Sequence, residues 1–486
     1  MNPRRGRAGR EPGRDRPSRP GNVAPPPRRT SPAGPPSIDP ARAAALELLT
    51  AVREREAYAN LAMPAILRRS RLSGRDAALA TELGYGACRA RGLLDAVVAA
   101  CAQRPLSRIE PPLLDALRLG TYQLLRTRIP PHAAVDSTVE LVRASAGSRS
   151  AGFVNAILRG VGERTEQQWV AELAPDPTKD PIGHLAFRHA HPRWIAQAFS
   201  DALHGSLTDL DALMAAADAR PTVHLLGRPG EITAEELALA TGGEPAPYSP
   251  YGVRLESGSG DPGELDAVTE GLAVVMDEGS QLVALALADA PLVGEDTGRW
   301  LDLCAGPGGK ACLLAALVGM AGGRLDAVEP AEHRAALVRE VTAELPVTVH
   351  VADGRAGPLP DAGFDRVLVD VPCTGLGALR RRPEARWRRS PSDVAGLTAL
   401  QRELLDAALR HVRVGGVVGY VTCSPHLAET HGVLAAVLRG RTDVERLNAT
   451  EVLATVPDLG EGPTAQLWPH RHGTDAMFLA LLRRTG

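Results

Sequence analysis

The stretch "LDLCAGPGGKACLLAAL", Leu301 to Leu317, reads as a short apolar strand, a glycine loop and the start of a helix. Glycines permit a tight turn and let a ligand approach the backbone, and the helix N-terminus offers free amide groups. The loop formally fits the pattern G-x-G-x-x-A through Gly306, Gly308 and Ala311. It predicts a cofactor site, but it suits a nicotinamide dehydrogenase and an S-adenosylmethionine-dependent methyltransferase equally.

The segment around this loop alternates apolar strands with helical stretches. The expected strands are "RWLDLCAG", "GRLDAVEP", "VTVHVADG", "FDRVLVDVPC", "GGVVGYVTCS" and "AMFLALLRR". Such alternation predicts a mainly parallel, doubly wound, Rossmann-like α/β domain, which we place at residues 296–486. The last strand follows a turn-rich segment with no intervening helix, so we expect it to pair antiparallel at or near the sheet edge.

The sequence before residue 296 predicts three further parts, so the chain is expected to be multidomain. Residues 1–40 are rich in Pro, Gly and Arg and predict a disordered basic tail. Residues 41–163 have helical apolar spacing, as in Ala45, Leu48, Leu49 and Val52, which predicts an all-α domain. Residues 164–295 are expected to form a linker and a small α+β module, with strands in "TVHLLGR", "YGVRLES" and "LAVVMDEGS" and a helix from about residue 234.

Composition narrows the possible partners and compartment. The net charge of -2 over 486 residues gives no global attraction to nucleic acid, so RNA binding would have to use local basic patches. Six cysteines without a close C-x-x-C pair favour free thiols in a reducing cytoplasm over disulfides or a metal site. No run of about 18 apolar residues is present, so no membrane span is expected. The oligomeric state stays open.

Three carboxylates follow successive predicted strands: Glu329, Asp353 and Asp370. A carboxylate about 20 residues beyond the glycine loop suits a ribose diol, and the next one suits an adenine amino group. S-adenosylmethionine carries a sulfonium and no pyrophosphate, so an acidic pocket fits its charge better than it fits a dinucleotide. These carboxylates therefore favour the methyltransferase. Lys310, one of two lysines in this Arg-rich chain, indicates a further specific contact.

Two thiols end two neighbouring strands in the same way, Cys373 in "DVPCTG" and Cys423 in "YVTCS". Both would face the cofactor pocket, although a single buried cysteine is more often inert packing. Carbon 5 of a pyrimidine accepts a methyl group only after a nucleophile adds to carbon 6, and a cysteine thiolate can perform that addition. An adjacent acid, Asp370, would support the attack by hydrogen bonding or proton transfer to the ring.

A basic loop follows Cys373, "TGLGALRRRPEARWRR", and it carries one tryptophan, Trp387. A solvated charge run is the ordinary interpretation of such a segment. Its position beside the two thiols instead favours contacts with the phosphates of a single-stranded or flipped-out nucleotide. The six arginines expected to make these contacts are Arg380, Arg381, Arg382, Arg386, Arg388 and Arg389.

Together these motifs resemble the Sun-type RNA cytosine-C5 methyltransferase family, especially its bacterial 16S ribosomal RNA branch. "DLCAGPGGK" is similar to the family's cofactor loop, "DVPCTGLGALRRRPE" to its Pro-Cys motif and "YVTCS" to its Thr-Cys motif. "DEGSQLVALAL" resembles the helix before the catalytic fold. The segments "ARAAALELL", "ELGYGACRARGLLD" and "GFVNAILR" resemble a NusB-type RNA-binding domain, which marks the ribosomal RNA branch.

The resemblance implies roles that spacing alone leaves open. It makes Cys423 the thiol that attacks carbon 6, Cys373 the thiol that assists release of the product, and S-adenosylmethionine the cofactor. The cofactor contacts it implies are Cys304, Ala305, Gly306, Pro307, Gly308, Gly309, Lys310, Glu329, Asp353 and Asp370.

Three alternatives remain. A noncatalytic NusB-type RNA-binding factor would leave both thiols unexplained, and so would a dehydrogenase. The same chemistry on transfer RNA differs only in the substrate, and only the NusB-like segments favour 16S ribosomal RNA over it.

Overall fold

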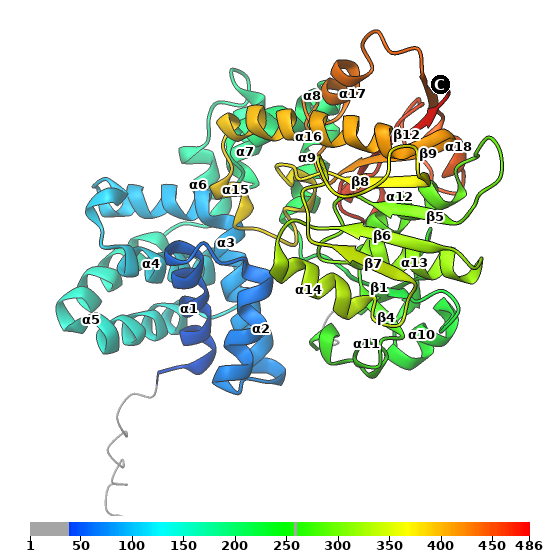
Figure 1. Ribbon diagram of the computed structural model, residues 1–486. Coiled ribbons are helices and arrows are strands. Elements are labelled where there is room, and N and C mark those ends of the chain that lie inside the picture. Colours follow the sequence, from blue (N-terminus) through cyan, green and yellow to red (C-terminus); the bar gives the residue numbers. More distant parts are fainter. Residues whose placement is uncertain (1–37, 257–259) are drawn as a thin grey trace, which may run out of the picture. The chain divides into compact units, whose positions relative to one another are not determined.

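The structure is a computed structural model that describes residues 38–256 and 260–486 (Figure 1). Most of the predicted tail, up to residue 37, lies outside the described residues. The helical domain begins at Pro40, where Asp39 caps the first helix by accepting a hydrogen bond from the Arg42 amide at 2.9 Å. A carboxylate at this position satisfies an otherwise unpaired N–H group, and proline is well suited to the first helical turn.

Five helices form the predicted all-α domain. They are α1 (Pro40–Glu54), α2 (Ala59–Ser70), α3 (Gly74–Ala102), α4 (Pro111–Arg126) and α5 (Pro131–Val161). The apolar residues that predicted α1, Ala45, Leu48 and Leu49, are buried against its neighbours. Gly147 interrupts α5 with φ 82°, a left-handed conformation that glycine adopts without steric cost.

Four further helices follow, where the sequence had predicted only a linker. They are α6 (Glu166–Leu173), α7 (Pro181–Arg188), α8 (Arg193–Ala202) and α9 (Leu207–Asp218). Each has eight to twelve residues, too few turns for a clear apolar period. Local capping signals were nevertheless present, because Thr165 and Gln168 form a capping box at the start of α6.

A small antiparallel sheet then forms the predicted α+β module, in the order β2-β3-β1-β4. Its strands are β1 (Val223–Gly227), β2 (Glu244–Pro245), β3 (Gly252–Leu255) and β4 (Ala273–Val275). Its helices are α10 (Ala234–Thr241) and α11 (Asp266–Thr269). The helix α12 (Glu278–Asp289) connects this module to the main sheet.

The main sheet has the order β10-β12-β9-β8-β5-β6-β7. The five strands from β9 to β7 are parallel, and β12 pairs antiparallel with both β9 and β10. The predicted α/β fold and the antiparallel last strand near the edge are both confirmed. The strands are β5 (Arg299–Asp302), β6 (Arg324–Val328), β7 (Val347–His350), β8 (Phe364–Asp370), β9 (Val412–Thr422), β10 (Val444–Leu447), β11 (Ala465–Gln466), which pairs with β12, and β12 (Phe478–Arg484).

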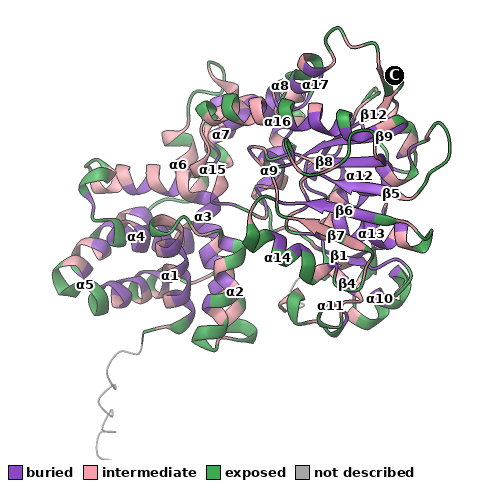
Figure 2. Cartoon of the chain, in the orientation of Figure 1, coloured by how far each residue is buried: buried purple, intermediate pink, exposed green. Residues whose placement is uncertain are grey.

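Two apolar clusters cover the two faces of this sheet. In β8, Leu368 packs into the cluster that contains α12 and α13, whereas Val367 and Val369 pack toward α16 and α17. This alternation is the period of two expected of a strand buried on both faces, and Figure 2 shows the central strands buried. The helices after β5 are α13 (Gly309–Met320), α14 (Glu332–Val341), α15 (Ala385–Arg388), α16 (Pro391–His411), α17 (His431–Val437), α18 (Ala449–Val452) and α19 (Pro469–His472).

No helix in the described part of the chain is both long and apolar enough to cross a membrane.

Candidate active site

The glycine loop lies between β5 and α13, with β8 on one side of β5 and β6 on the other. Gly308 has φ 114°, and a Cβ atom there would lie 2.4 Å from the Val341 side chain. A Cβ at Gly306 would lie 2.2 Å from Oε2 of Glu329. Gly308 therefore requires glycine, whereas a side chain at Gly306 would displace the ends of the Glu329 and Arg334 side chains. The backbone of the loop forms a cradle beside Glu329.

Glu329 borders this cradle from the end of β6. Its side chain is 2% exposed, Oε1 accepts a hydrogen bond from the Ala331 amide at 3.0 Å, and Oε2 lies 3.3 Å from Nη1 of Arg334. Arg334 also donates a hydrogen bond to the Gly306 carbonyl at 2.6 Å. The structure thus places the predicted ribose-binding carboxylate beside the glycine loop. A carboxylate can accept hydrogen bonds from a ribose diol, so this arrangement fits a nucleoside cofactor.

Asp353 follows β7 at the same edge, but its hydrogen bonds run within its own loop. Its carboxylate is about half exposed and forms an ion pair with Arg355 at 2.6 Å, and Arg355 also binds Glu403 at 2.6 Å. The hydrogen bonds and charge of Arg355 hold the pKa of Asp353 below its usual value. An adenine contact from Asp353 would have to share this carboxylate with Arg355.

Lys310, in the first turn of α13, pairs with Asp370 at the end of β8, with Nζ 2.7 Å from Oδ2. Burial opposes the lysine charge, but the neighbouring carboxylate outweighs it and raises the pKa of Lys310. The loop lysine singled out in the sequence therefore makes a specific contact. This contact connects the glycine loop to the strand that leads to Cys373.

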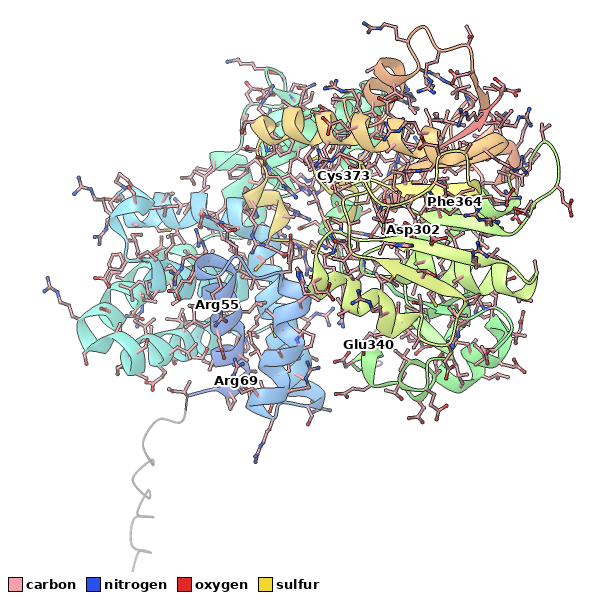
Figure 3. All side chains as sticks on the ribbon, viewed as in Figure 1. Arg55, Arg69, Asp302, Glu340, Phe364 and Cys373 are labelled. Atoms are coloured by element: carbon pink, nitrogen blue, oxygen red, sulfur yellow. The ribbon has the colours of Figure 1, made fainter. Side chains whose placement is uncertain are left out.

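The two predicted thiols meet at the ends of adjacent parallel strands. Sγ of Cys373 and Sγ of Cys423 are 3.4 Å apart. Figure 3 shows Phe364 at the start of β8 and Cys373 just beyond the other end of that strand. The hydrogen bond to Cys423, burial and the charge of Glu429 raise the pKa of Cys373 well above the usual thiol value. Cys373 is therefore held as a neutral thiol at neutral pH.

Sequence reasoning missed two buried carboxylates at this edge. Glu429 is fully buried and accepts hydrogen bonds from Thr374 and Gln401. Asp302 ends β5 within the quoted "LDLCAG" stretch and is 1% exposed. Burial, followed by the charge of Asp370, raises the pKa of Asp302 to about 7. The position of Asp302 at a strand end was the available signal, the same one that identified Glu329 and Asp370.

We expect Asp302→Asn to stabilise the fold at high pH. The native pKa of about 7 exceeds the ordinary value of 3.8, so the carboxyl group releases its proton less readily in the folded state and wild-type stability falls as pH rises from about 4 to 7. One pKa unit corresponds to about 1.4 kcal/mol, so the variant's gain at pH 8 can reach about 4 kcal/mol. Urea unfolding at pH 4 and pH 8 measures it.

Asp365→Asn is the matched control. Asp365 is as buried as Asp302, but it lies near the start of β8, at the opposite edge of the sheet from Asp302. Burial opposes its charge, but hydrogen bonds from Arg413 and Thr297 lower its pKa. The control is therefore expected to lose stability at pH 8. Equal responses of the two variants to pH would contradict the account.

The arginine loop differs from its predicted role as a phosphate-binding surface. Four of its arginines bind protein groups, which leaves them little freedom to reach a nucleic acid. Arg386 is fully buried and pairs with Asp218 at 3.2 Å. The other contacts join Arg380 and Arg381 to Asp277 and Asp475, and Arg388 to the carbonyl of Ala57. Trp387 donates to the Cys88 carbonyl at 3.0 Å.

Removing Arg386 is expected to destabilise the protein by about 3 kcal/mol, because the change deletes a fully buried side chain that forms an ion pair and backbone hydrogen bonds. Arg386→Ala also removes the hydrogen bond to the Ala217 carbonyl at 2.6 Å, although Arg126 still pairs with Asp218. Arg382→Ala is the control, since Arg382 is exposed and contacts the Tyr58 ring, so a loss below about 1 kcal/mol is expected. Similar shifts for both variants in thermal unfolding would contradict this.

Family models match two parts of the chain. The model described as 16S rRNA methyltransferase RsmB/F matches residues 290–483, and the NusB family model matches residues 39–163. The first of these ranges contains the glycine loop and both thiols, and the second contains the five-helix domain.

Similar curated proteins extend over nearly the whole chain. A putative methyltransferase of Mycobacterium tuberculosis is 61% identical over 448 residues, which cover 92% of this chain and 97% of that protein. Ribosomal RNA small subunit methyltransferase B of Pseudomonas putida is 33% identical over 451 residues, covering 91% and 98%.

Solved structures share the fold. The crystal structure of PH0851 matches with a TM-score of 0.72 and 22% identity, covering 92% of this chain and 99% of that one. NSun6 from Pyrococcus horikoshii, determined with SFG, matches with a TM-score of 0.51 and 18% identity, covering 61% and 98%.

Proposed function

This chain belongs to the RsmB/F family of 16S rRNA methyltransferases, and from that premise we propose that it methylates carbon 5 of a cytosine in 16S ribosomal RNA. The observation that carries the cytosine chemistry is the pair of thiols 3.4 Å apart, at the sheet edge that also holds the Lys310–Asp370 pair. Methylation of a ring nitrogen or a ribose hydroxyl gives such a pair no role.

Cys423 acts as the nucleophile in this proposal. Its sulfur bonds to carbon 6 of the cytosine, and the displaced π electrons make carbon 5 nucleophilic. The raised pKa of Cys373 keeps that thiol protonated, which suits a role in product release rather than in the attack. After methyl transfer a base removes the proton from carbon 5, the double bond re-forms, and the bond between carbon 6 and sulfur breaks. Cys373 assists this release.

Asp370 and Lys310 support the attack on the ring. Addition at carbon 6 makes N3 and O2 of the cytosine more basic, so a neighbouring acid or hydrogen-bond donor stabilises the transition state. Lys310 lies 2.7 Å from Asp370 and holds its carboxylate in place. These roles require the cytosine to enter at the carboxyl ends of β8 and β9.

The methyl donor is S-adenosylmethionine, which supplies an electrophilic methyl group on a sulfonium. The residues proposed to hold it are the loop from Cys304 to Lys310, Glu329 for the ribose and Asp353 for the adenine. The position of Glu329 directly beside the glycine loop and its burial support this placement. The carboxylate groups at this edge also favour a cationic donor over a pyrophosphate.

Nucleoside analysis tests the proposal and its substrate. The full chain, incubated with methyl-labelled S-adenosylmethionine and either 16S ribosomal RNA or transfer RNA, is expected to yield labelled 5-methylcytidine only from the ribosomal RNA. The same product from transfer RNA alone would retain the chemistry and replace the substrate. Label in another nucleoside would overturn the proposed reaction.

A further inference from the structure

Glu429 is a buried carboxylate in the loop that follows Cys423, and it contacts the loop that carries Cys373. It lies six residues after Cys423, just before α17, and its side chain has no solvent exposure. Oε1 accepts hydrogen bonds from the Thr374 amide at 2.8 Å and from Nε2 of Gln401 at 3.0 Å, and Oε2 accepts one from the Thr374 hydroxyl. Both oxygens are therefore engaged by neighbours of Cys373.

The same network reaches both thiol-bearing loops. Thr374, directly after Cys373, has its hydroxyl 3.0 Å from that of Ser424, directly after Cys423. Gln401 of α16 also donates to the carbonyl of Pro372, directly before Cys373, at 2.9 Å. The two loops are thus connected through buried side chains of Thr374, Ser424 and Gln401.

We propose that Glu429 is a positioning residue that holds Cys373 and Cys423 at their working separation by fixing Thr374 and Ser424. Its effect on methyl transfer rests on the function proposed above, whereas its effect on the thiol separation can be measured without RNA. A misplacement of about 1 Å at reacting groups can cost about a hundredfold in rate, so such a residue matters even without touching the substrate.

Two substitutions of Glu429 separate the effect of its hydrogen bonds from the effect of its negative charge. Glu429→Gln keeps an oxygen for the Thr374 amide and Gln401, and its NH2 group can donate to the Thr374 hydroxyl, which then donates to Ser424. Glu429→Ala loses all of these bonds. Both variants remove a negative charge that contributes to the raised pKa of Cys373, after the Cys423 hydrogen bond and burial. Loss of that charge alone would accelerate thiol oxidation.

Disulfide trapping with diamide measures the thiol separation. The two thiols lose two hydrogens and form one S–S bond, and the N=N bond of diamide takes up both hydrogens as a hydrazine. Peptide mapping under nonreducing conditions follows the Cys373–Cys423 product. Glu429→Ala is expected to form it at least about tenfold more slowly than wild type, although its charge effect acts in the opposite direction. Glu429→Gln is expected to match or exceed the wild-type rate.

Two further variants guard against a general loss of stability. Thr374→Val removes the hydroxyl link between the loops at similar volume and is expected to slow trapping as well. Asp365→Ala is the matched control: Asp365 is as buried as Glu429 and also binds an amide and hydroxyl of one threonine, Thr297, but at the opposite end of β8. It is expected to trap at the wild-type rate.

Steady-state kinetics supply the second readout. For Glu429→Ala, kcat is expected to fall roughly a hundredfold while KM for RNA and for S-adenosylmethionine changes little. The positioning role would be overturned if Glu429→Ala formed the Cys373–Cys423 disulfide at the wild-type rate, or if Asp365→Ala formed it as slowly as Glu429→Ala. Slow trapping by Glu429→Ala together with no cytosine methylation by wild type would retain the positioning role and refute the proposed function.

Discussion

Cys423→Ala is expected to reduce cytosine methylation by roughly 10⁴-fold or more, because no other group can replace a covalent nucleophile at carbon 6. The change removes one sulfur from the end of β9 and leaves the glycine loop and Glu329 untouched, so binding of S-adenosylmethionine is expected to persist. Transfer of a labelled methyl group to RNA measures the first effect, and equilibrium dialysis measures the second.

Cys101→Ala is the matched control for this change. Cys101 is a free, partly buried thiol in α3 of the helical domain, and its replacement is expected to leave methylation near the wild-type rate. Methylation by Cys423→Ala at a tenth of the wild-type rate or more would mean that another group attacks the ring.

Cys373→Ala is also expected to lower turnover, but for a different reason: the enzyme remains covalently attached to its methylated product. Cys423 can still attack and the methyl group can still transfer, but the thiol 3.4 Å away that assists release is gone. A covalent protein–RNA complex that survives denaturing electrophoresis should therefore accumulate to nearly one per enzyme, while turnover falls by roughly 10² to 10⁴-fold.

The double variant identifies the origin of this complex. Cys373→Ala combined with Cys423→Ala is expected to form no adduct, because the sulfur that bonds to carbon 6 is absent. An adduct in the double variant, or rapid turnover without an adduct in Cys373→Ala, would contradict the assignment of the two thiols.

The main sheet and the meeting of the thiols were predictable because they follow from local pattern and a general rule. Apolar strands alternating with helices predict a parallel sheet, and the parallel pairing of β8 with β9 brings the residues after Asp370 and Thr422 to one edge. The prediction of a late antiparallel strand had a similar local basis, since no helix connects it to the preceding segment.

The burial of the arginine loop could not be predicted from its own residues. Arg386 pairs with Asp218, 168 positions earlier, and nothing near either residue announces the other. A run of arginines without its partners has the composition of an exposed nucleic-acid contact. Glu429 was missed for the same reason, because its importance depends on Thr374, 55 positions earlier.

The role of Cys423 as the nucleophile is tested most directly with 16S ribosomal RNA that contains 5-fluorocytidine. Fluorine at carbon 5 cannot be removed as a proton, so the methylated adduct cannot release the enzyme. Peptide mass spectrometry then identifies the cysteine to which the RNA is attached. The RNA is expected to be attached to Cys423, and the adduct is expected to depend on S-adenosylmethionine. Attachment at Cys373, or methylation of RNA with no adduct at either thiol, would contradict this role of Cys423.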